Sequence, residues 1–163
     1  MLHINPSSFI FSRWLFLSLR GAIFCIAFVS FWVQAEGLIG TNGILPASKF
    51  LGLLSEQLGI ERFYLVPTLA WLFPDGYLLI CFVGASLSLL LTCNIGPTRI
   101  LLFSLYVLYL SLLSISGVFM SFQWDILLIE TSFLAIFLVP SGLKPVWPRS
   151  EAPPQKITIL LMW

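Results

Sequence analysis

The feature that most constrains this chain is a series of apolar runs that are each long enough to cross a bilayer. Residues 14–33 contain a single charged side chain, Arg20, in an otherwise apolar or weakly polar run. A helix needs about 20 such residues to cross roughly 30 Å of hydrocarbon. Similar runs occupy residues 77–93, 99–120 and 124–140. We therefore expect four full transmembrane spans.

The composition is typical of an integral membrane protein. Hydrophobic residues make up 59% of the chain and charged residues 9%, and the mean hydropathy is +1.01. Soluble domains carry about 25% charged residues. The net charge is only +1, without a Lys and Arg cluster that could neutralise a run of phosphates, which argues against a nucleic-acid partner. The predicted fold class is an all-α, multi-pass transmembrane helix bundle, with residues 1–163 as a single transmembrane domain.

The residues used in common catalytic and metal sites are scarce. His3 is the one histidine in the sequence, so the chain alone cannot form an HExxH zinc site or a Ser-His-Asp triad. Cys25, Cys81 and Cys93 lie in or at the end of apolar runs, where cysteine is typically a small packing residue. We predict no metal, no cofactor and no catalytic residue of these types, and favour a non-enzymatic role.

Polar side chains in the last full run are the clearest functional signal. Gln123, Asp125 and Glu130 lie in the segment SFQWDILLIETSFLAIFLVP, with Glu130 about two helical turns inside it. A lone carboxylate at that depth costs at least a few kcal/mol, so we expect it to be protonated, hydrated or paired. One hypothesis is a polar network of these three residues and Arg20, with Arg20 and Glu130 as an ion pair. Alternatively, Arg20 extends back to the interface and a neutral Glu130 bonds a neighbouring serine or tyrosine hydroxyl.

Small residues recur at helical spacing in the first three runs and predict faces where helices approach closely. They are Ser18, Gly21, Ala22 and Cys25 in the first run, Gly84, Ser88 and Thr92 in the second, and Ser104, Ser111, Ser114, Gly117 and Ser121 in the third. Tyr109 lies in the middle of the third run and needs a partner for its hydroxyl. We consider Tyr109 and Ser114 as possible partners of Glu130.

The longest connection, residues 34–76, begins with a turn. Gly40, Asn42, Gly43 and Pro46 lie in the stretch EGLIGTNGILP, whose composition predicts a tight reversal with positive φ angles. This turn is a candidate contact surface on the outer or lumenal side of the membrane. The alternative is that its glycines serve only a sharp reversal after the first span.

The rest of this connection is predicted to lie at the membrane surface. Residues 47–58 have an apolar face and a polar face, which suits an interfacial helix. Residues 63–73 are apolar but interrupted by Pro67, and they are too few to span a bilayer. We therefore expect an interfacial helical segment between the first and second spans.

The chain after the fourth span predicts further membrane structure. The stretch KPVWPRSEAPPQK is proline-rich, which is typical of a stiff connector, and residues 157–163 begin a fifth apolar run. That run is too short to span, so we expect the chain to be the amino-terminal part of a longer protein or, alternatively, a product truncated inside a helix. With four spans, the same side of the membrane as the amino terminus carries most of the basic residues, namely Arg13, Arg99, Lys144, Arg149 and Lys156. The positive-inside rule therefore places the amino terminus in the cytoplasm.

Three passages are distinctive beyond their apolar character. They are FSRWLFLSLRGAIFCIAFVSFWVQAEGLIGTNGILPA, FYLVPTLAWLF and SFQWDILLIETSFLAIFLVP. In order and spacing they resemble the amino-terminal membrane part of the lipase maturation factor family. The GLIGTNGILP turn and the QWDILLIET helix are the most specific parts of this resemblance.

The resemblance implies a multi-pass membrane protein that assists the folding and assembly of secreted proteins, homodimeric lipases among them. The membrane would be that of the endoplasmic reticulum in a eukaryote or the inner, cytoplasmic membrane in a bacterium. Family members continue into further spans and a large carboxyl-terminal region. The implied partners are the lipid bilayer and a client lipase or another secreted protein.

Two other functions stay open. The chain is also similar, more remotely, to the membrane domain of vitamin K-dependent γ-carboxylases, which implies an intramembrane enzyme with a quinone-type cofactor. Arg20 and Glu130 would then line a polar cavity, where a buried acid near a cation suits proton transfer. The depth of Glu130 is also compatible with a transport subunit that uses a proton-coupled carboxylate.

Overall fold

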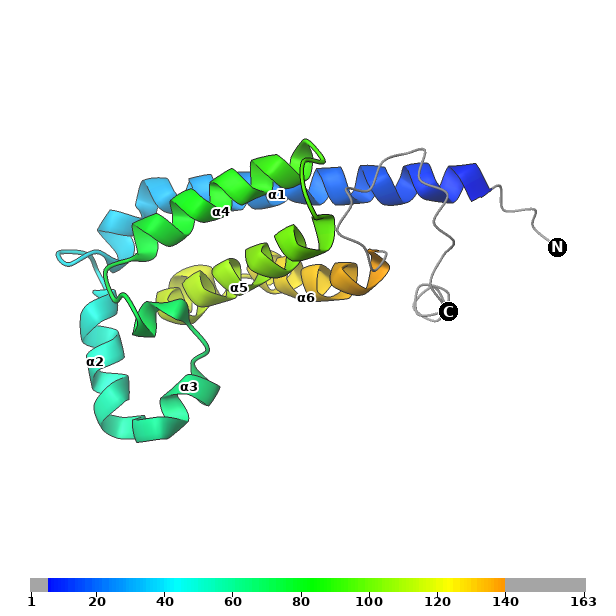
Figure 1. The fold of residues 1–163 in the computed structure, drawn as a ribbon. Helices are drawn as coiled ribbons and strands as arrows, with labels where there is room; N and C mark the ends of the chain where they lie inside the picture. Colours follow the sequence, from blue (N-terminus) through cyan, green and yellow to red (C-terminus); the bar gives the residue numbers. More distant parts are fainter. Residues whose placement is uncertain (1–5, 140–163) are drawn as a thin grey trace.

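The computed structural model describes the backbone of residues 6–139 and the side chains of residues 11–139, and every regular element in this range is a helix (Figure 1). The helices are α1 (Pro6–Ile39), α2 (Ala47–Leu58), η1 (Gly59–Glu61), α3 (Arg62–Leu65), η2 (Leu69–Trp71), α4 (Tyr77–Thr92), α5 (Thr98–Ser116), η3 (Gly117–Met120) and α6 (Gln123–Leu138). The predicted all-α fold is confirmed over these residues. The proline-rich connector and the predicted fifth run lie outside the described residues.

Two stretches of the described chain are long and apolar enough to cross a membrane. They are Phe11–Ile39 within α1 and Thr98–Met120, which covers α5 and η3. The helix α4 is apolar but has only 16 residues, and α6 also has 16 residues and contains two carboxylates. The helix α1 has 34 residues and is therefore much longer than the predicted span.

Figure 1 shows α1 and α4 side by side in one layer, with α5 and α6 side by side beneath them. The contact between α1 and α4 depends on two glycines. A Cβ atom on Gly21 would lie 2.6 Å from the backbone nitrogen of Thr92, and one on Gly84 would overlap the ring of Phe28. The predicted close approach of the small-residue faces on these two helices is therefore confirmed.

A cluster of three aromatic rings joins the two layers. The ring of Tyr109 on α5 meets the rings of Phe24 and Phe28 on α1 edge to face, with centroids 5.7 and 5.3 Å apart. All three side chains are buried. Such pairs contribute about 0.5–1.5 kcal/mol each beyond their buried area, so this cluster helps to fix α5 against α1.

The turn between α4 and α5 is also tied to α1. Asn94 has a left-handed φ of 54°, and Gly96 follows with a φ of 96°. Asparagine and glycine adopt these angles more easily than other residues, which is why this short turn can reverse the chain. The Nδ2 atom of Asn94 then donates to Oγ of Ser18, at 2.8 Å. The turn is thereby held against α1.

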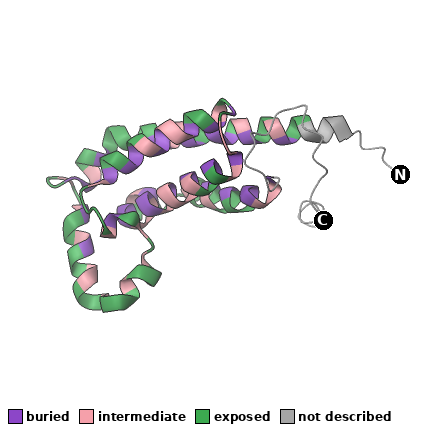
Figure 2. Cartoon of the chain, viewed as in Figure 1, coloured by how far each residue is buried: buried purple, intermediate pink, exposed green. Residues whose placement is uncertain are grey.

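The connection between α1 and α4 leaves the bundle and returns to it. Figure 1 shows α2 running across the direction of the long helices instead of along it. Ala47 and Leu51 of α2 are buried, whereas Lys49 and Glu56 are exposed, as expected for the predicted amphipathic helix. Figure 2 shows that exposed residues cover most of α2 and α3.

The returning part of this connection docks on the small polar stripe of α5. Thr68 donates from Oγ1 to the Ser111 carbonyl oxygen at 3.0 Å, and the Leu69 N–H donates to Ser111 Oγ at 3.2 Å. Ser114 donates to the carbonyl oxygen of Pro67 at 3.2 Å. The serines of the predicted third-run stripe therefore bind backbone from a segment too short to span the membrane itself.

Candidate functional site

Arg20 is the most deeply buried charged side chain that the structure describes. It lies on α1, points into the bundle, and is 5% exposed. Its Nη2 atom donates to the carbonyl oxygen of Leu128 at 3.0 Å and to Oγ of Ser132 at 2.5 Å, both on α6. Hydrogen bonds to a charged group contribute about 1.5–3 kcal/mol each, so Arg20 ties the first helix to the last described one.

The ion pair suggested between Arg20 and Glu130 is not formed. Leu128 and Ser132 are four residues apart and share the face of α6 that meets Arg20. Glu130 lies two residues from each of them, so it is on the opposite face, where it is exposed. The alternative in which Arg20 extends back to the interface is also wrong, because its guanidinium is held inside the bundle.

The surroundings of Arg20 are otherwise aromatic. The guanidinium carbon lies 5.5 Å from the ring centre of Phe16 and 6.0 Å from that of Phe24. A cation over an aromatic face is stabilised by the ring quadrupole, and more so where water is excluded. The guanidinium charge is thus stabilised by a carbonyl group, a hydroxyl and two aromatic rings, and no carboxylate among residues 11–139 is bonded to it.

Asp125 instead pairs with Tyr109. The Tyr109 hydroxyl donates to Oδ1 of Asp125 at 2.5 Å, and Asp125 lies half buried in the first turn of α6. A carboxylate is favoured there because the helix dipole is positive at its N-terminus. Tyr109 was considered as a partner of Glu130, and the structure assigns it to the other acid. The sequence contained a sign of this bond, because a buried tyrosine hydroxyl usually has a hydrogen-bond partner and Asp125 is the first acidic residue after the α5–α6 turn.

The predicted polar network is therefore divided into separate contacts. Arg20 bonds α6 at Leu128 and Ser132, and Asp125 bonds α5 through Tyr109. Gln123 is exposed at the first residue of α6, and Glu130 is exposed farther along it. The structure thus brings neither Gln123 nor Glu130 to Arg20.

A groove opens between α1 and α6 beside Asp125. It encloses about 530 Å³, and the side chains along it come mainly from one stripe of α1 and from the start of α6. Tyr109 forms part of its inner wall. No group of three or more His, Cys, Asp and Glu side chains that could hold a metal ion occurs in the described part of the chain.

The turn after α1 folds back onto the last turn of that helix. The N–H groups of Ile44 and Leu45 donate to the carbonyl oxygens of Gly37 and Leu38, at 3.1 and 2.9 Å. Within the turn, the Gly43 N–H donates to the Gly40 carbonyl oxygen at 2.9 Å. The predicted sharp reversal is therefore confirmed, and these backbone hydrogen bonds hold it in place.

The expectation of positive φ angles in this turn is wrong, because neither Gly40 nor Gly43 has one. Glycine is needed at position 40 for a different reason, since a Cβ atom there would overlap the carbonyl oxygen of Glu36. Asn42 is exposed at the tip of the turn, and Pro46 directly precedes α2 with a φ of −57°.

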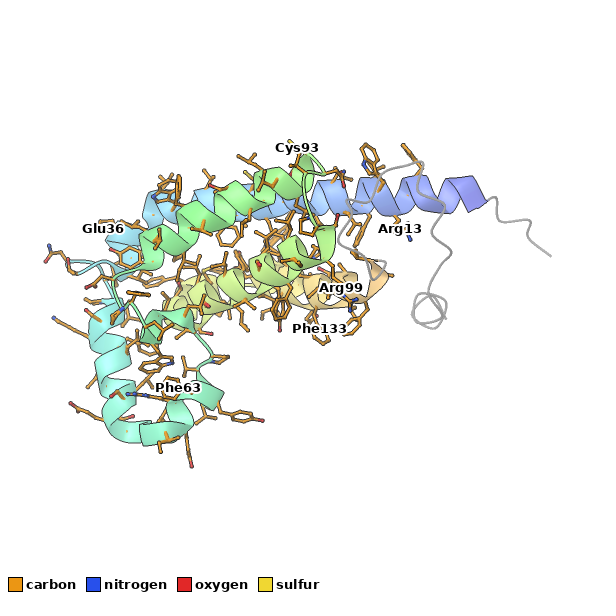
Figure 3. All side chains as sticks on the ribbon, in the orientation of Figure 1. Arg13, Glu36, Phe63, Cys93, Arg99 and Phe133 are labelled. Atoms are coloured by element: carbon orange, nitrogen blue, oxygen red, sulfur yellow. The ribbon has the colours of Figure 1, made fainter. Side chains whose placement is uncertain are left out.

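One contact near this turn was missed by the sequence reasoning. The hydroxyl of Tyr77, at the start of α4, donates to Oε2 of Glu36 near the end of α1 at 2.7 Å. Figure 3 shows Glu36 at the end of the bundle that carries the turn, with Arg13 and Arg99 toward the other end. This bond holds the ends of α1 and α4 together where the connection leaves the bundle.

Comparison with known proteins identifies the family. The model described as "Lipase maturation factor transmembrane domain" matches residues 11–163. The chain belongs to the lipase maturation factor family. It is 41% identical to lipase maturation factor 2 of Gallus gallus over 160 residues, and 38% identical to that of Homo sapiens over 151 residues. It is 28% identical to lipase maturation factor 1 of Homo sapiens over 171 residues.

These lipase maturation factors are much longer than the aligned region. The three alignments cover 92%, 86% and 99% of this chain, but only 22%, 21% and 29% of the respective relatives. The resemblance found from the GLIGTNGILP and QWDILLIET stretches is confirmed. No solved structure gives a significant match.

Proposed function

We propose that this chain is the membrane-embedded part of a factor that assists the maturation of secreted proteins, lipases among them. The observation that carries this proposal is the family match over residues 11–163, together with relatives that are named lipase maturation factors. In this role the helices form a scaffold, and client contact falls on the parts of the chain outside the hydrocarbon.

We place four spans in the bilayer, namely α1, α4, α5 and α6. The outward faces of all four helices support this, since apolar side chains are exposed on each of them: Val33 on α1 (81%), Leu79 on α4 (62%), Phe103 on α5 (57%) and Phe133 on α6 (49%). Apolar side chains on the outside of a bundle are favourable in lipid and unfavourable in water. The membrane is that of the endoplasmic reticulum in a eukaryote and the cytoplasmic membrane in a bacterium.

The charges suggest which end of the bundle faces the cytoplasm. Arg13 and Arg99 lie toward one end, and Glu36 lies at the other with the α1–α4 connection (Figure 3). Basic residues near the ends of spans favour the cytoplasmic side. The amino terminus is therefore placed in the cytoplasm and the connection on the outer or lumenal side.

The connection is the surface that we assign to client contact. Ile60 and Tyr64, around the bend between α2 and α3, are each 89% exposed. Large exposed apolar side chains outside a span are typical of a surface that binds a partner or the bilayer surface. The Gly40–Pro46 turn positions this surface relative to α1, because the backbone of the turn is hydrogen-bonded to the last turn of that helix.

The experiment is gene deletion and rescue in the cells that produce this protein. We expect deletion to lower the activity of a secreted lipase several-fold without changing its messenger RNA, and the intact gene to restore it. A gene with Ile60→Ser and Tyr64→Ser should fail to restore activity, whereas Lys49→Gln on the exposed face of α2 should restore it. Unchanged lipase activity after deletion would refute the maturation role. Full rescue by the double variant would refute the assigned surface.

The two other functions are not favoured. Both the quinone-dependent enzyme and the proton-coupled transporter needed Glu130 to face the interior, the former beside Arg20. Glu130 is exposed, and Arg20 is bonded to Leu128 and Ser132. The relatives are named as maturation factors.

A further inference from the structure

We propose that the groove between α1 and α6 binds one neutral lipid with a glycerol head and a single acyl chain. The head would lie beside Asp125, and the acyl chain would run along α1 toward Ile23. This inference does not depend on the maturation role, because it rests on the shape and polarity of the groove.

The groove has the size of a ligand site, and its part from Ile23 to Gln34 has about the length of one membrane leaflet. Its volume of about 530 Å³ lies within the range of roughly 300–1,000 Å³ that is usual for small-molecule sites. Its lining on α1 extends from Ile23 to Leu38. The part from Ile23 to Gln34 rises by about 16 Å at 1.5 Å per residue, close to half of a hydrocarbon core of about 30 Å.

Polar groups interrupt an otherwise apolar lining, in which Leu38, Phe119 and Trp124 also lie toward the end that carries the α1–α4 connection. Ser30 and Gln34 on α1 and Asp125 on α6 lie toward the end that carries the α1–α4 connection. Ile23 and Leu128 line the part nearer the middle of the bundle. From the polar groups toward Ile23 the lining is apolar, so this part of the groove suits a lipid whose head lies at the polar groups and whose tail lies along α1.

The polar end favours a head group that donates hydrogen bonds. Tyr109 bonds Oδ1 of Asp125, and no other hydrogen bond to this carboxylate is formed by residues 11–139. Gln34 donates through Nε2 to the Ser30 carbonyl oxygen at 3.2 Å, which leaves its own Oε1 as an acceptor. Two acceptors on one groove suit a head with two hydroxyl groups.

The charge of Asp125 excludes the commonest anionic heads. A phosphate or fatty-acid carboxylate placed against it would face a like charge in a medium of low dielectric constant. Neutral glycerol offers hydroxyl donors without that repulsion, and a single chain suits a groove of about 530 Å³ whose apolar lining runs from the polar groups toward Ile23. These two properties define a monoacylglycerol.

The test is photo-crosslinking of the purified full chain in detergent with a monoacylglycerol that carries a diazirine on its acyl chain. We expect the label on peptides that contain residues 23–38 or 119–128. Unlabelled monoolein should compete at least tenfold better than phosphatidylcholine or oleic acid. Label spread evenly over all exposed apolar faces, or equal competition by phosphatidylcholine, would show ordinary solvating lipid and overturn the proposal.

Two substitutions on α1 separate the groove from the rest of the helix surface. Ala27→Trp should fill the groove and reduce labelling at least tenfold, whereas Val33→Trp, on an 81% exposed side chain outside the groove, should leave it unchanged. Circular dichroism and gel filtration confirm that both variants remain folded. Retained labelling in folded Ala27→Trp would refute the site. Absence of labelling together with crosslinks between two copies through α1 and α6 would assign the groove to self-association.

Discussion

A methyl group added at Gly21 should separate α1 from α4, whereas the same change at Gly37 on the same helix should not. The new Cβ at Gly21 would lie 2.6 Å from the Thr92 backbone nitrogen and 2.9 Å from the Ser88 carbonyl oxygen. Backbone atoms of a helix cannot rotate away as a side chain can, so the helices must shift. Overpacking of this kind costs about 1–3 kcal/mol.

Gly37 is the matched control. It is helical and exposed, and a Cβ atom there would meet nothing within 4 Å. Alanine is favoured over glycine in a helix by about 0.5–1 kcal/mol. Gly37→Ala should therefore stabilise the fold slightly while Gly21→Ala destabilises it, a difference of roughly 1.5–4 kcal/mol between two variants of identical composition.

The assay is unfolding in mixed micelles with increasing dodecyl sulfate, followed by tryptophan fluorescence and circular dichroism. Both variants should show one transition, displaced in opposite directions from that of the unsubstituted chain. If Gly21→Ala is as stable as Gly37→Ala, the two helices do not approach as closely as the structure shows, and the proposed role of the small-residue faces is wrong.

Two further predictions concern the acids of α6. Tyr109→Phe should cost about 1–3 kcal/mol in the same assay, because Asp125 loses its donor; a double-mutant cycle with Asp125→Leu should show a coupling above about 0.5 kcal/mol, and strict additivity would contradict the bond. Glu130→Gln should change stability by no more than about 0.5 kcal/mol, because the side chain is exposed and Arg20 does not use it. A loss of several kcal/mol at Glu130 would contradict the orientation of α6.

The helices and the faces on which they pack closely could be predicted because they depend on residue size and spacing along the chain. Small residues around positions 21 and 84 indicated a close approach on each of the two runs, but the structure showed that α1 and α4 approach each other, with Gly84 against Phe28. Docking of Pro67 and Thr68 onto α5 could not be predicted in the same way. It depends on how the long connection returns through space, and local composition does not determine that path.

The partner of Arg20 could not be predicted, because the depth of a residue in the membrane does not determine the rotation of its helix about the helix axis. Counting residues from the ends of the runs placed Arg20 and Glu130 at similar depth, but a helix turns by about 100° per residue, so two residues along α6 reverse the direction of a side chain. Apolar residues occur on all sides of α6, which leaves its rotation undetermined by hydrophobicity alone. Ser132 rather than Glu130 was the informative residue.

The choice of Ser132 and a carbonyl oxygen as partners of Arg20 has a physical basis. Bringing both a guanidinium and a carboxylate out of water costs several kcal/mol for each ion, and their attraction does not always compensate. A carbonyl and a hydroxyl already belong to the helix and add no second charge to the interior. Because the Leu128 carbonyl also accepts from the hydroxyl of Ser132, Arg20 joins a bond that α6 makes within itself. The contact therefore sets the rotation of α6 about its axis, and that rotation turns Asp125 toward Tyr109 and the groove while Glu130 faces outward.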